Sequence, residues 1–598
     1  MKSSAFKLFL FIVVISGNFA IAQSTFKYLS PLPDSKYNMP QATIIIKPEA
    51  MPTESSLNGS SIIVKGEKSG IHTGKILFSQ KDNCIIFKPD VVFSTGEKVS
   101  VEININNSEK FGYSFFVSKN PHAIRYSNID DEMKEGRSEY RNTESVSSYH
   151  RPDSLPSDMP PITIKTNLGG TDAGKIFLAN LSNVGAGYAP YMMILNNDGS
   201  LYWYKKMLVN AYDFKKQPNG LLTYSLYNVF KYYAMDTAYN VVDSFYCGNG
   251  YNTDEHELLL MDNGHALMMG YDPQIIDMSE IVPGGDTAAT VIGMVIQELN
   301  ENKEVIFQWS TFDHFSILDA THTNFTSSII DCVHSNALSV ESDGNIMMSS
   351  RNMDEITKIN RTTGDIIWRL GGSNNQFTFI NDTNRFSHQH SIRRVSPTNI
   401  ILFDNGNFHT PQFSRAVEYT LDEVNKTCTL VWEFRNTPTV QAYAMGNVQR
   451  LPNGNTVIGW GTSVPTMTEV DPSGQKIYEI SFPITVMNYR AFRFVWKDSV
   501  TTSVSTIGET AGSYNLRQNY PNPFNPVTNI EFEIPKNAFV SLKIYDALGR
   551  NIENLLSKEM VAGKYSVQFN AANLSTGLYF YEMTSGNFRQ VRKMVLIK

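Results

Sequence analysis

Short runs of alternating hydrophobic and polar residues, separated by turn residues, extend along most of this chain of 598 residues. Alternation with a period of two is typical of half-buried strands, whereas the three-and-four spacing of helices is nearly absent. Near the N-terminus the runs are 42–48, 61–66, 83–89 and 98–105. Turn residues separate them at intervals that predict an Ig-like β-sandwich over residues 27–118.

The pattern between residues 166 and 497 is repetitive. Each unit has an Asp-Gly or Asn-Gly turn, a few apolar residues, a second turn and a strand that ends in an aromatic residue. The turns are Asp198-Gly199, Asn219-Gly220, Asn263-Gly264, Asp343-Gly344, Asn405-Gly406 and Asn453-Gly454. The aromatic residues are Trp203, Phe245, Trp309, Trp368, Trp432 and Tyr478. A four-stranded blade buries its faces only against neighbouring blades, so the pattern predicts a six-bladed β-propeller. A doubly wound α/β fold or an open array of sandwiches fits this repeat less well.

The first 22 residues have the layout of a secretory signal peptide. Lys2 and Lys7 precede a short apolar run, and Ala20-Ile21-Ala22 is a small-x-small cleavage site. The run is shorter than the roughly 18 apolar residues of a membrane-spanning helix, which argues against an N-terminal anchor. We therefore expect export through the Sec pathway.

The last part of the chain follows a Ser/Thr/Gly-rich linker at 498–512. Alternation at 540–544 and 565–569 predicts a small C-terminal β-sandwich over 513–598. This segment has three further features: the motif YPNPFNP at 520–526, the later motif YDALGR, and a basic, apolar tail. Together they closely resemble the C-terminal sorting domain of the type IX (Por) secretion system. The resemblance implies the type IX machinery as a partner. It also implies secretion to the medium or attachment at the outer cell surface.

The net charge and the spacing of the cysteines argue against several classes of function. The 51 Lys and Arg and 58 Asp and Glu give a net charge of −7, and no long basic run is present, which argues against a nucleic-acid partner. The four cysteines, Cys84, Cys247, Cys332 and Cys428, form no close pair, which argues against a disulfide scaffold, a zinc ribbon or thioredoxin-like chemistry. A polar segment at 119–165 has the composition of a linker.

Three histidines stand at a similar phase of successive repeats. His256 lies eight residues before Gly264, His334 ten before Gly344, and His390 nine before Asn399, where a turn is expected. The same phase means the same radial position in a propeller, and the innermost strands line a central channel. A single histidine in a β protein is more often a satisfied core group, but three in register are expected to converge at one mouth of the channel.

Other polar residues recur near this phase, and together they indicate a chemistry. Asn336 follows His334, whereas Arg351 and Thr462 each follow a turn. Arginine is a forked donor that matches tetrahedral oxyanions, and imidazole serves as a nucleophile or an acid. A three-histidine zinc site is the alternative, but the arginine would oppose a cation. The set favours transfer of a sulfuryl or phosphoryl group through histidine, without a metal or a cofactor.

An ordered series of motifs then resembles the bacterial arylsulfate sulfotransferases that do not use a nucleotide sulfate donor. The series comprises His334-Ser335-Asn336 and the segments 349–372, 386–391, 401–407, 414–423, 431–435 and 446–462. The resemblance implies an N-terminal β-sandwich and a six-bladed propeller with its site at the channel. It also implies ping-pong transfer from an aryl sulfate to a phenolic acceptor.

The resemblance assigns roles to individual residues. His390, preceded by Gln389, matches the nucleophile that becomes a sulfohistidine, although His388 is a near neighbour. His334 and Asn336 match the family's His-x-Asn pair. Arg351 matches the arginine that holds the sulfuryl oxygens, His256 a further channel histidine, and Thr462 a polar substrate contact.

Two other functions stay open at this point. A non-catalytic exported propeller could act as an adhesin or bind glycans, although it would have no need of the histidine and arginine set. A quinone-dependent dehydrogenase would need a calcium-binding carboxylate set, which the sequence does not place. The physiological donor and acceptor are not fixed by the sequence, and it leaves a homodimer open.

Overall fold

The computed structural model describes residues 26–57, 61–105, 110–121, 156–182, 187–496, 505–508, 512–571 and 574–597. The expected signal peptide and most of the two expected linkers lie outside these residues. Within the described part, the regular elements are β-strands and short 3₁₀ turns, which confirms the all-β class. No helix in this part is long and apolar enough to cross a membrane. The chain forms two compact units, and the second begins at Trp496.

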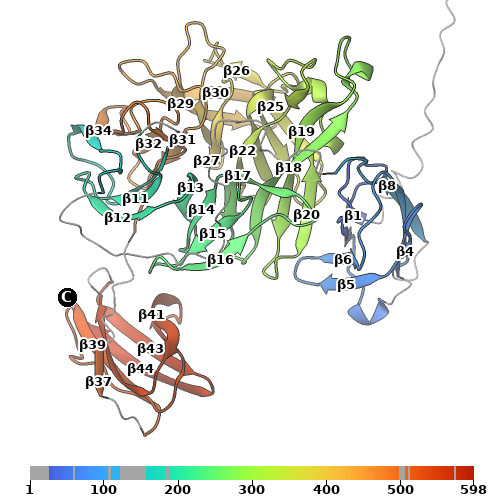
Figure 1. Ribbon diagram of the computed structural model, residues 1–598. Helices are drawn as coiled ribbons and strands as arrows, with labels where there is room; N and C mark the ends of the chain where they lie inside the picture. Colours follow the sequence, from blue (N-terminus) through green and yellow to red (C-terminus); the bar gives the residue numbers. More distant parts are fainter. Residues whose placement is uncertain are drawn as a thin grey trace, which may run out of the picture. The chain divides into compact units, whose positions relative to one another are not determined.

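The first unit opens with two four-stranded antiparallel sheets, as expected for the N-terminal sandwich (Figure 1). One sheet has the order β1-β2-β6-β5, with bounds Phe26–Ser30, Ile44–Pro48, Cys84–Pro89 and Gly74–Ser79. The other has the order β4-β3-β7-β8, with bounds Gly70–His72, Ile62–Gly66, Lys98–Ile103 and Phe111–Phe116. Their inward residues, including Ile44, Val64, Val101 and Phe115, are fully buried and form one core.

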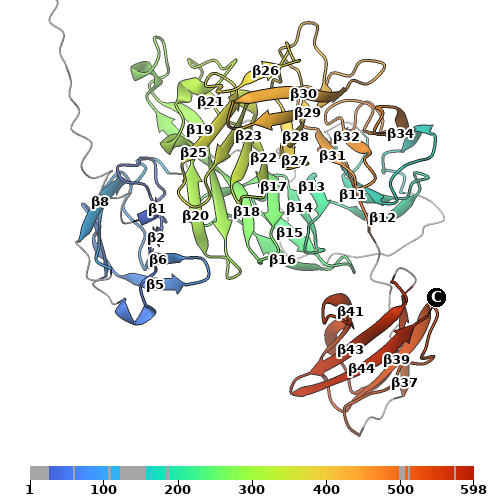
Figure 2. The same ribbon diagram turned by 180° about the vertical axis from the view of Figure 1, so that it is seen from behind.

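Six further sheets form the blades of the propeller (Figures 1 and 2). Blade 1 contains β10 (Lys175–Leu181), β11 (Tyr191–Leu195), β12 (Leu201–Lys206), β35 (Met487–Asn488) and β36 (Phe492–Phe494). Blade 2 contains β13 (Ala211–Lys216), β14 (Leu222–Leu226), β15 (Tyr232–Met235) and β16 (Val241–Phe245). Blade 3 contains β17 (Asn252–Leu260), β18 (Ala266–Ile276), β19 (Ala289–Leu299), β20 (Val305–Ser310) and β21 (Ile329–Asp331).

The remaining blades follow in chain order. Blade 4 contains β22 (Ser335–Val340), β23 (Ile346–Ser350), β24 (Glu355–Ile359) and β25 (Ile366–Gly371). Blade 5 contains β26 (Thr378–Ile380), β27 (His390–Arg394), β28 (Asn399–Asp404), β29 (Arg415–Asp422) and β30 (Thr427–Phe434). Blade 6 contains β31 (Asn447–Arg450), β32 (Thr456–Gly459), β33 (Met467–Val470), β34 (Lys476–Ser481) and β9 (Thr163–Asn167).

Both ends of the propeller segment close the ring. Strand β9 pairs with β34 of blade 6, and strands β35 and β36 pair with β10 of blade 1. The side chain of Asn447 on β31 exchanges two hydrogen bonds with the backbone of Ala491, which ties blade 6 to the strand that completes blade 1. Closure removes the exposed sheet edges that an open array would leave.

Each of the six aromatic residues of the sequence repeat lies on a different blade, on strands β12, β16, β20, β25, β30 and β34. That strand is at the edge of the sheet in blades 1 to 4, and a fifth strand covers it in blades 5 and 6. Three of them, Trp309, Trp368 and Tyr478, are almost fully buried, so they fill the space between neighbouring blades. The predicted turns behave less uniformly. Asp198-Gly199 joins β11 to β12, and Asn405-Gly406 follows β28, whereas the other four join the first two strands of their blade.

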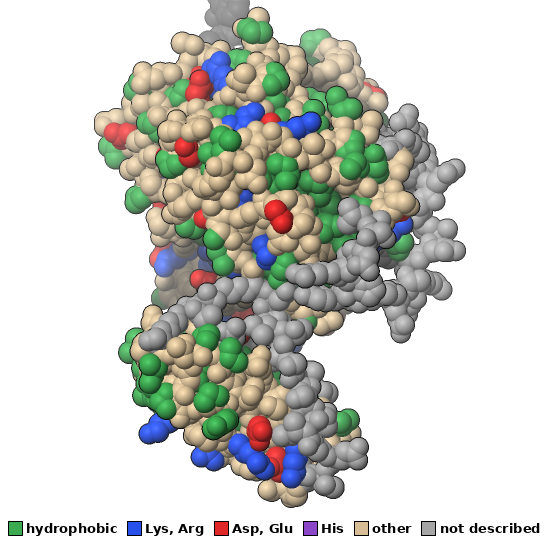
Figure 3. All heavy atoms as spheres, turned by 90° about the vertical axis from the view of Figure 1, so that its left-hand side faces the viewer, with side chains coloured by type: hydrophobic (Ala, Val, Ile, Leu, Met, Phe, Trp, Pro, Cys, Tyr) green, Lys and Arg blue, Asp and Glu red, His purple; other side chains and the backbone are tan. Residues whose placement is uncertain are grey.

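The second unit is the C-terminal sandwich. One sheet has the order β37-β42-β39-β38, with bounds Ser505–Gly508, Gly563–Asn570, Val527–Ile534 and Asn515–Leu516. The other has the order β41-β40-β43-β44, with bounds Asn551–Met560, Ala538–Asp546, Gly577–Ser585 and Phe588–Leu596. Phe524 of the YPNPFNP motif is buried in the shared core. Charges of both signs are scattered among neutral and hydrophobic side chains over the molecular face in Figure 3.

Candidate active site

Two of the three expected histidines meet at the channel. His256 lies on β17 and His334 directly precedes β22, and their ring centroids are 5.1 Å apart. Nδ1 of His256 lies 2.8 Å from Asp254 Oδ2, and Nδ1 of His334 lies 2.7 Å from Asp331 Oδ2. A carboxylate behind Nδ1 holds the proton there and leaves Nε2 directed away from the carboxylate. Burial lowers the pKa of His256, but the Asp254 carboxylate raises it more, and the net shift is upward.

His390 begins β27 and is 2% exposed. Its Nδ1 lies 2.8 Å from Asn405 Oδ1, and its Nε2 accepts a hydrogen bond from Met445 N at 3.2 Å. The amide nitrogen of Asn405 donates to the carbonyls of Ala442 and Met445, which fixes its oxygen toward the ring. Nδ1 therefore carries the hydrogen, and Nε2 carries the lone pair. Burial first, and then the Arg351 charge, hold the pKa of His390 well below its usual range.

Asn336 connects His334 to His390. Its Nδ2 donates to Gln389 O at 2.8 Å, and its Oδ1 accepts from Ser391 N at 3.3 Å. The side chain is fully buried and brackets His390 through the two adjacent peptide groups. Its expected contact with the sulfate stays a prediction. Its described contacts position the backbone of β27.

Arg351 follows β23 and reaches the same mouth. Its Nη1 donates to Asn352 Oδ1 at 2.8 Å and its Nη2 to Tyr443 O at 3.3 Å, whereas its buried Nε has no hydrogen-bond partner. Within the described residues, no salt bridge joins Arg351 to a carboxylate such as Asp354. Burial lowers the pKa of Arg351, and a guanidinium in this setting still carries a full positive charge. Its charge is therefore available to an anion.

Thr462 lies after β32, at the edge of the same region. Its Oγ1 donates to Ala444 O at 3.3 Å. Met445, which follows Ala444 in the chain, contacts His390. Thr462 thus supports the loop that covers the His390 ring. Its own contact with a substrate stays a prediction.

His388 is the neighbour with which His390 could be confused. Its Nδ1 accepts from Asn407 Nδ2 at 3.0 Å, and its ring lies edge-on to Phe408 at 4.9 Å. Burial, followed by the charge of Arg351, lowers the pKa of His388 to about 3. Phe408 also stacks on His322, with a centroid distance of 3.4 Å, and is 47% exposed. The sequence pattern does not mark His322, Phe408 and Met445 as site residues, because they lie in loops outside the repeat, and it marks Asn405 only as a turn residue.

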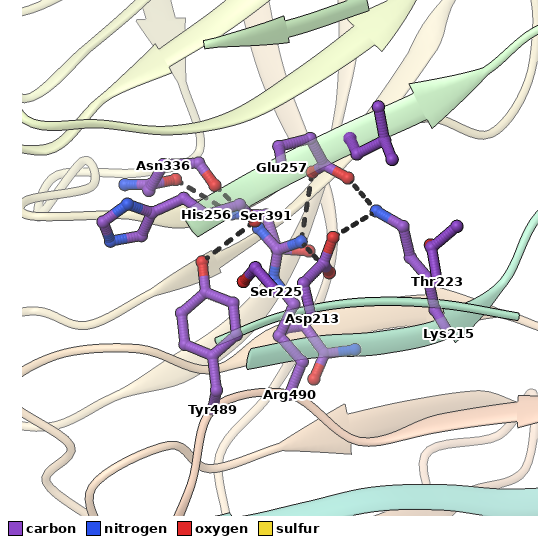
Figure 4. A network of polar contacts seen from close by, with 12 residues as sticks. Asp213, Lys215, Thr223, Ser225, His256, Glu257, Asn336, Ser391, Tyr489 and Arg490 are labelled. Carbon is purple, nitrogen blue, oxygen red and sulfur yellow. Dashed lines mark hydrogen bonds and ion pairs between the residues drawn. The ribbon is translucent and has the colours of Figure 1, made fainter. Parts of the chain in front are cut away.

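A buried network of charges closes the channel beside the histidines (Figure 4). Arg490 Nη1 lies 2.7 Å from Asp213 Oδ1 and 3.1 Å from Glu257 Oε2, and its Nη2 donates to Asn336 O at 2.7 Å. Figure 4 shows Lys215 directed at the same two carboxylates, and Arg393 also pairs with Glu257. Burial of so many charges is expensive unless each is paired, so this network fixes the inner strands firmly.

The fold and this pocket define a closed six-bladed propeller with three histidines and an arginine gathered at one mouth. The sequence model of the family described as Arylsulfotransferase (ASST) matches residues 165–493, which is more than half of the chain. The chain belongs to the arylsulfotransferase family. It is therefore a transferase of sulfur-containing groups that acts on aryl sulfates.

A second family model, described as a secretion system C-terminal sorting domain, matches residues 518–598. This match confirms the sorting domain expected from the YPNPFNP motif. It marks the chain for type IX secretion to the cell surface or the exterior.

Comparison with curated proteins finds no match. Among solved structures, a protein of unknown function from Bacteroides caccae is 14% identical, with 54% of this chain and 99% of that chain covered and a TM-score of 0.35. Virginiamycin B lyase from Staphylococcus aureus is 9% identical, with 54% and 89% covered and a TM-score of 0.29. A quinonprotein alcohol dehydrogenase-like protein from Bacteroides thetaiotaomicron is 10% identical, with 77% and 96% covered and a TM-score of 0.27.

Proposed function

We propose that the propeller moves a sulfuryl group from a phenolic sulfate ester to a phenolic acceptor by a ping-pong reaction through a sulfohistidine at His390. The observation that carries this proposal is the state of the His390 ring. Its Nδ1 hydrogen is held by Asn405, and its pKa is well below the usual range, so Nε2 offers a neutral lone pair. A buried neutral imidazole is a competent nucleophile, and its hydrogen-bonded Nδ1–H stabilises the positive ring that forms.

In the first half-reaction, Nε2 of His390 attacks the sulfur of the aryl sulfate. The N–S bond forms as the ester S–O bond breaks, and the electron pair of that bond leaves with the phenolate oxygen. A protonated His256 or His334 gives the phenolate a proton, so the phenol departs neutral. The raised pKa of His256 supports this acid role.

In the second half-reaction, the imidazoles of His256 and His334 act as bases instead of acids. One of them takes the proton of the incoming phenol, whose oxygen attacks the sulfur of the sulfohistidine. The N–S bond breaks, and His390 returns to its neutral state with the hydrogen still on Nδ1. Because one pocket serves both steps, the first phenol leaves before the second binds, which gives ping-pong kinetics.

Three residues are proposed to hold the sulfuryl group. Arg351 presents a buried charge with an unpaired Nε, which matches the oxygens of a sulfate. Thr462 is proposed as a polar contact, and Asn336 as a sulfate contact that also positions β27. The Met445 N–H, which contacts Nε2 in this structure, is placed to pass to a sulfuryl oxygen once Nε2 is occupied. Transfer of this loose kind requires mainly positioning and charge stabilisation.

The proposal also covers the export route of the chain and the boundaries of its domains. We infer that a signal peptide at 1–22 directs the chain through the Sec pathway before the type IX step. The proposed domains are a sandwich at 27–118, a linker at 119–165, the catalytic propeller at 166–497, a second linker at 498–512 and the sorting domain at 513–598. A homodimer is compatible with this arrangement.

The test of the catalytic proposal follows 4-nitrophenol release from 4-nitrophenyl sulfate, with and without a phenol acceptor. Wild type is compared with His390→Ala and with the neighbouring control His388→Ala. We expect acceptor-dependent release that is lost in His390→Ala. We also expect a peptide containing residue 390 to gain the mass of one SO₃ when donor alone is present. Labelling at residue 388 or 334 instead would move the nucleophile, and no turnover with any aryl sulfate would favour a non-catalytic binding protein.

A further inference from the structure

A second cluster of titratable side chains lies where the sandwich meets blade 3. The two parts pack together there, and Tyr28 of the sandwich stacks on Phe307 of β20 at 5.1 Å. Beside this contact is a solvent-open cleft of about 440 Å³. Asp82, in the turn between β5 and β6, faces His265 at the start of β18 across the cleft, and Glu301 follows β19.

Three atoms of this cluster have the spacing of metal ligands. His265 Nε2, Asp82 Oδ1 and Glu301 Oε2 all lie within 4.8 Å of one another. Nε2 is 3.1 Å from the aspartate oxygen and 3.5 Å from the glutamate oxygen. A tetrahedral zinc ion with nitrogen and oxygen ligands at about 2.1 Å separates neighbouring ligands by about 3.3 Å. The spacing therefore matches a tetrahedral ion with a fourth position open to water.

The other polar atom of each of these three side chains is held by a neighbour. The holding atoms are Ser79 Oγ for Asp82 Oδ2 (2.6 Å), Lys81 Nζ for Glu301 Oε1 (2.9 Å) and Glu298 Oε1 for His265 Nδ1 (2.6 Å). A carboxylate on the far nitrogen of a histidine fixes its tautomer and is the usual outer partner of a metal-binding imidazole. The ligand atoms are thus oriented before any ion arrives.

The inward atoms themselves lack partners. His265 is 4% exposed, and neither its Nε2 nor Asp82 Oδ1 has a hydrogen-bond partner among the described residues. A neutral His265 with its hydrogen directed at Glu298 turns the Nε2 lone pair toward the lone pairs of a carboxylate 3.1 Å away. Two such groups repel each other unless a cation or a second proton lies between them.

We propose that His265, Asp82 and Glu301 bind one divalent cation of the zinc type, which clamps the N-terminal sandwich to blade 3. The mixed nitrogen and oxygen set favours a first-row ion such as Zn²⁺, whereas Mg²⁺ and Ca²⁺ prefer oxygen alone. The sequence does not reveal this site, because the ligands come from two domains and form no short motif. The site shares no residue with the active site.

The experiment titrates the full chain, freed of metal by chelation and dialysis, with zinc chloride. Bound zinc is measured by elemental analysis, and thermal unfolding is followed with and without zinc. The variants are His265→Gln and Glu301→Gln. The matched control is Glu304→Gln, because it breaks the 3.2 Å ion pair with Lys88 across the same junction but removes no ligand.

We expect wild type and Glu304→Gln to bind one more equivalent of zinc than His265→Gln and Glu301→Gln. Zinc should raise the thermal stability of wild type and Glu304→Gln only. Glu301 is 43% exposed, so its variant carries the comparison if His265→Gln does not fold. Equal zinc binding by all four proteins would place the ion on the active-site histidines and overturn the proposal. So would thermal unfolding that zinc leaves unchanged in all four proteins.

Discussion

Asn405 Oδ1 lies 2.8 Å from His390 Nδ1, and the amide nitrogen of the same side chain is held by two backbone carbonyls. The asparagine cannot turn its nitrogen toward the ring without losing both of those bonds. Asn405 Oδ1 and the His388 carbonyl, 3.1 Å away, both accept from Nδ1, and the Met445 N–H donates to Nε2, so all three contacts favour the Nδ1–H tautomer.

Asn405→Ala should lower kcat/KM for aryl sulfates by about 10- to 100-fold, the usual effect of losing a partner that orients an imidazole. The ring would lose the side-chain acceptor at 2.8 Å that orients it and stabilises its charge, and only the longer contact with the His388 carbonyl would remain at Nδ1. Steady-state kinetics with 4-nitrophenyl sulfate measures this change, and circular dichroism checks the fold. Unchanged kinetics would mean that the tautomer is set elsewhere.

The first half-reaction should depend on pH through His256. The pKa of this imidazole is raised by Asp254 against the effect of burial, so the acid form persists at higher pH and is lost as the pH rises through the raised value. The leaving group of phenyl sulfate needs a proton, so single-turnover rates with this donor should fall as the pH rises through the raised pKa of His256. The pKa of His390 is lowered, so no matching loss is expected just below neutral pH.

The matched variant for this prediction is Asp254→Asn. Without the carboxylate, burial dominates and the pKa of His256 falls, so the rate should begin to fall at lower pH. 4-Nitrophenyl sulfate serves as the control donor, because its phenolate leaves readily without a proton and its profile should move less. Identical profiles for wild type and Asp254→Asn would assign the acid role to His334.

Phe408 is expected to contact the aromatic ring of the substrate. It is 47% exposed, stacks on His322 and lies beside His388 at the mouth that Arg351 also lines. Phe408→Ala should raise KM for aryl sulfates by about three- to tenfold, the range of one aromatic pair, with little change in kcat. Phe408→Tyr, which keeps the ring, should behave like wild type. A fall in kcat alone would indicate a role in the chemical step instead.

Arg490 should be the most sensitive residue of the buried charge network. Arg490→Met leaves Asp213 and Glu257 with fewer positive partners and removes the bond to the Asn336 carbonyl. Loss of one partner of a buried ion pair costs about 3–5 kcal/mol. Denaturant unfolding measures this loss, and Lys110→Met, at the exposed ion pair with Glu102, is the control with an expected effect near zero. Equal stability of both variants would contradict the structural role.

The sequence by itself determined the class of the fold. Six aromatic residues at irregular intervals of blade size predicted six blades, and each one lies on a different blade. This succeeds because a blade must bury its outer strand against the next blade, so the periodic pattern records a periodic packing. The family motifs also named His256, His334, His390, Arg351, Asn336 and Thr462, of which the structure brings the three histidines and Arg351 to one mouth.

Only the tertiary structure decided how those groups are tuned. Asn405, which the sequence shows only as a turn residue, and Met445 both reach His390 from other parts of the chain, and the paired charges around Glu257 come from three blades. The tertiary structure also brings together Asp82 and His265, which come from the sandwich and from the propeller and are distant in sequence. Burial and hydrogen bonding set pKa values and tautomers, and both depend on neighbours that are distant in sequence. A linear pattern can therefore name the reactive residues, but it cannot show which proton each one holds.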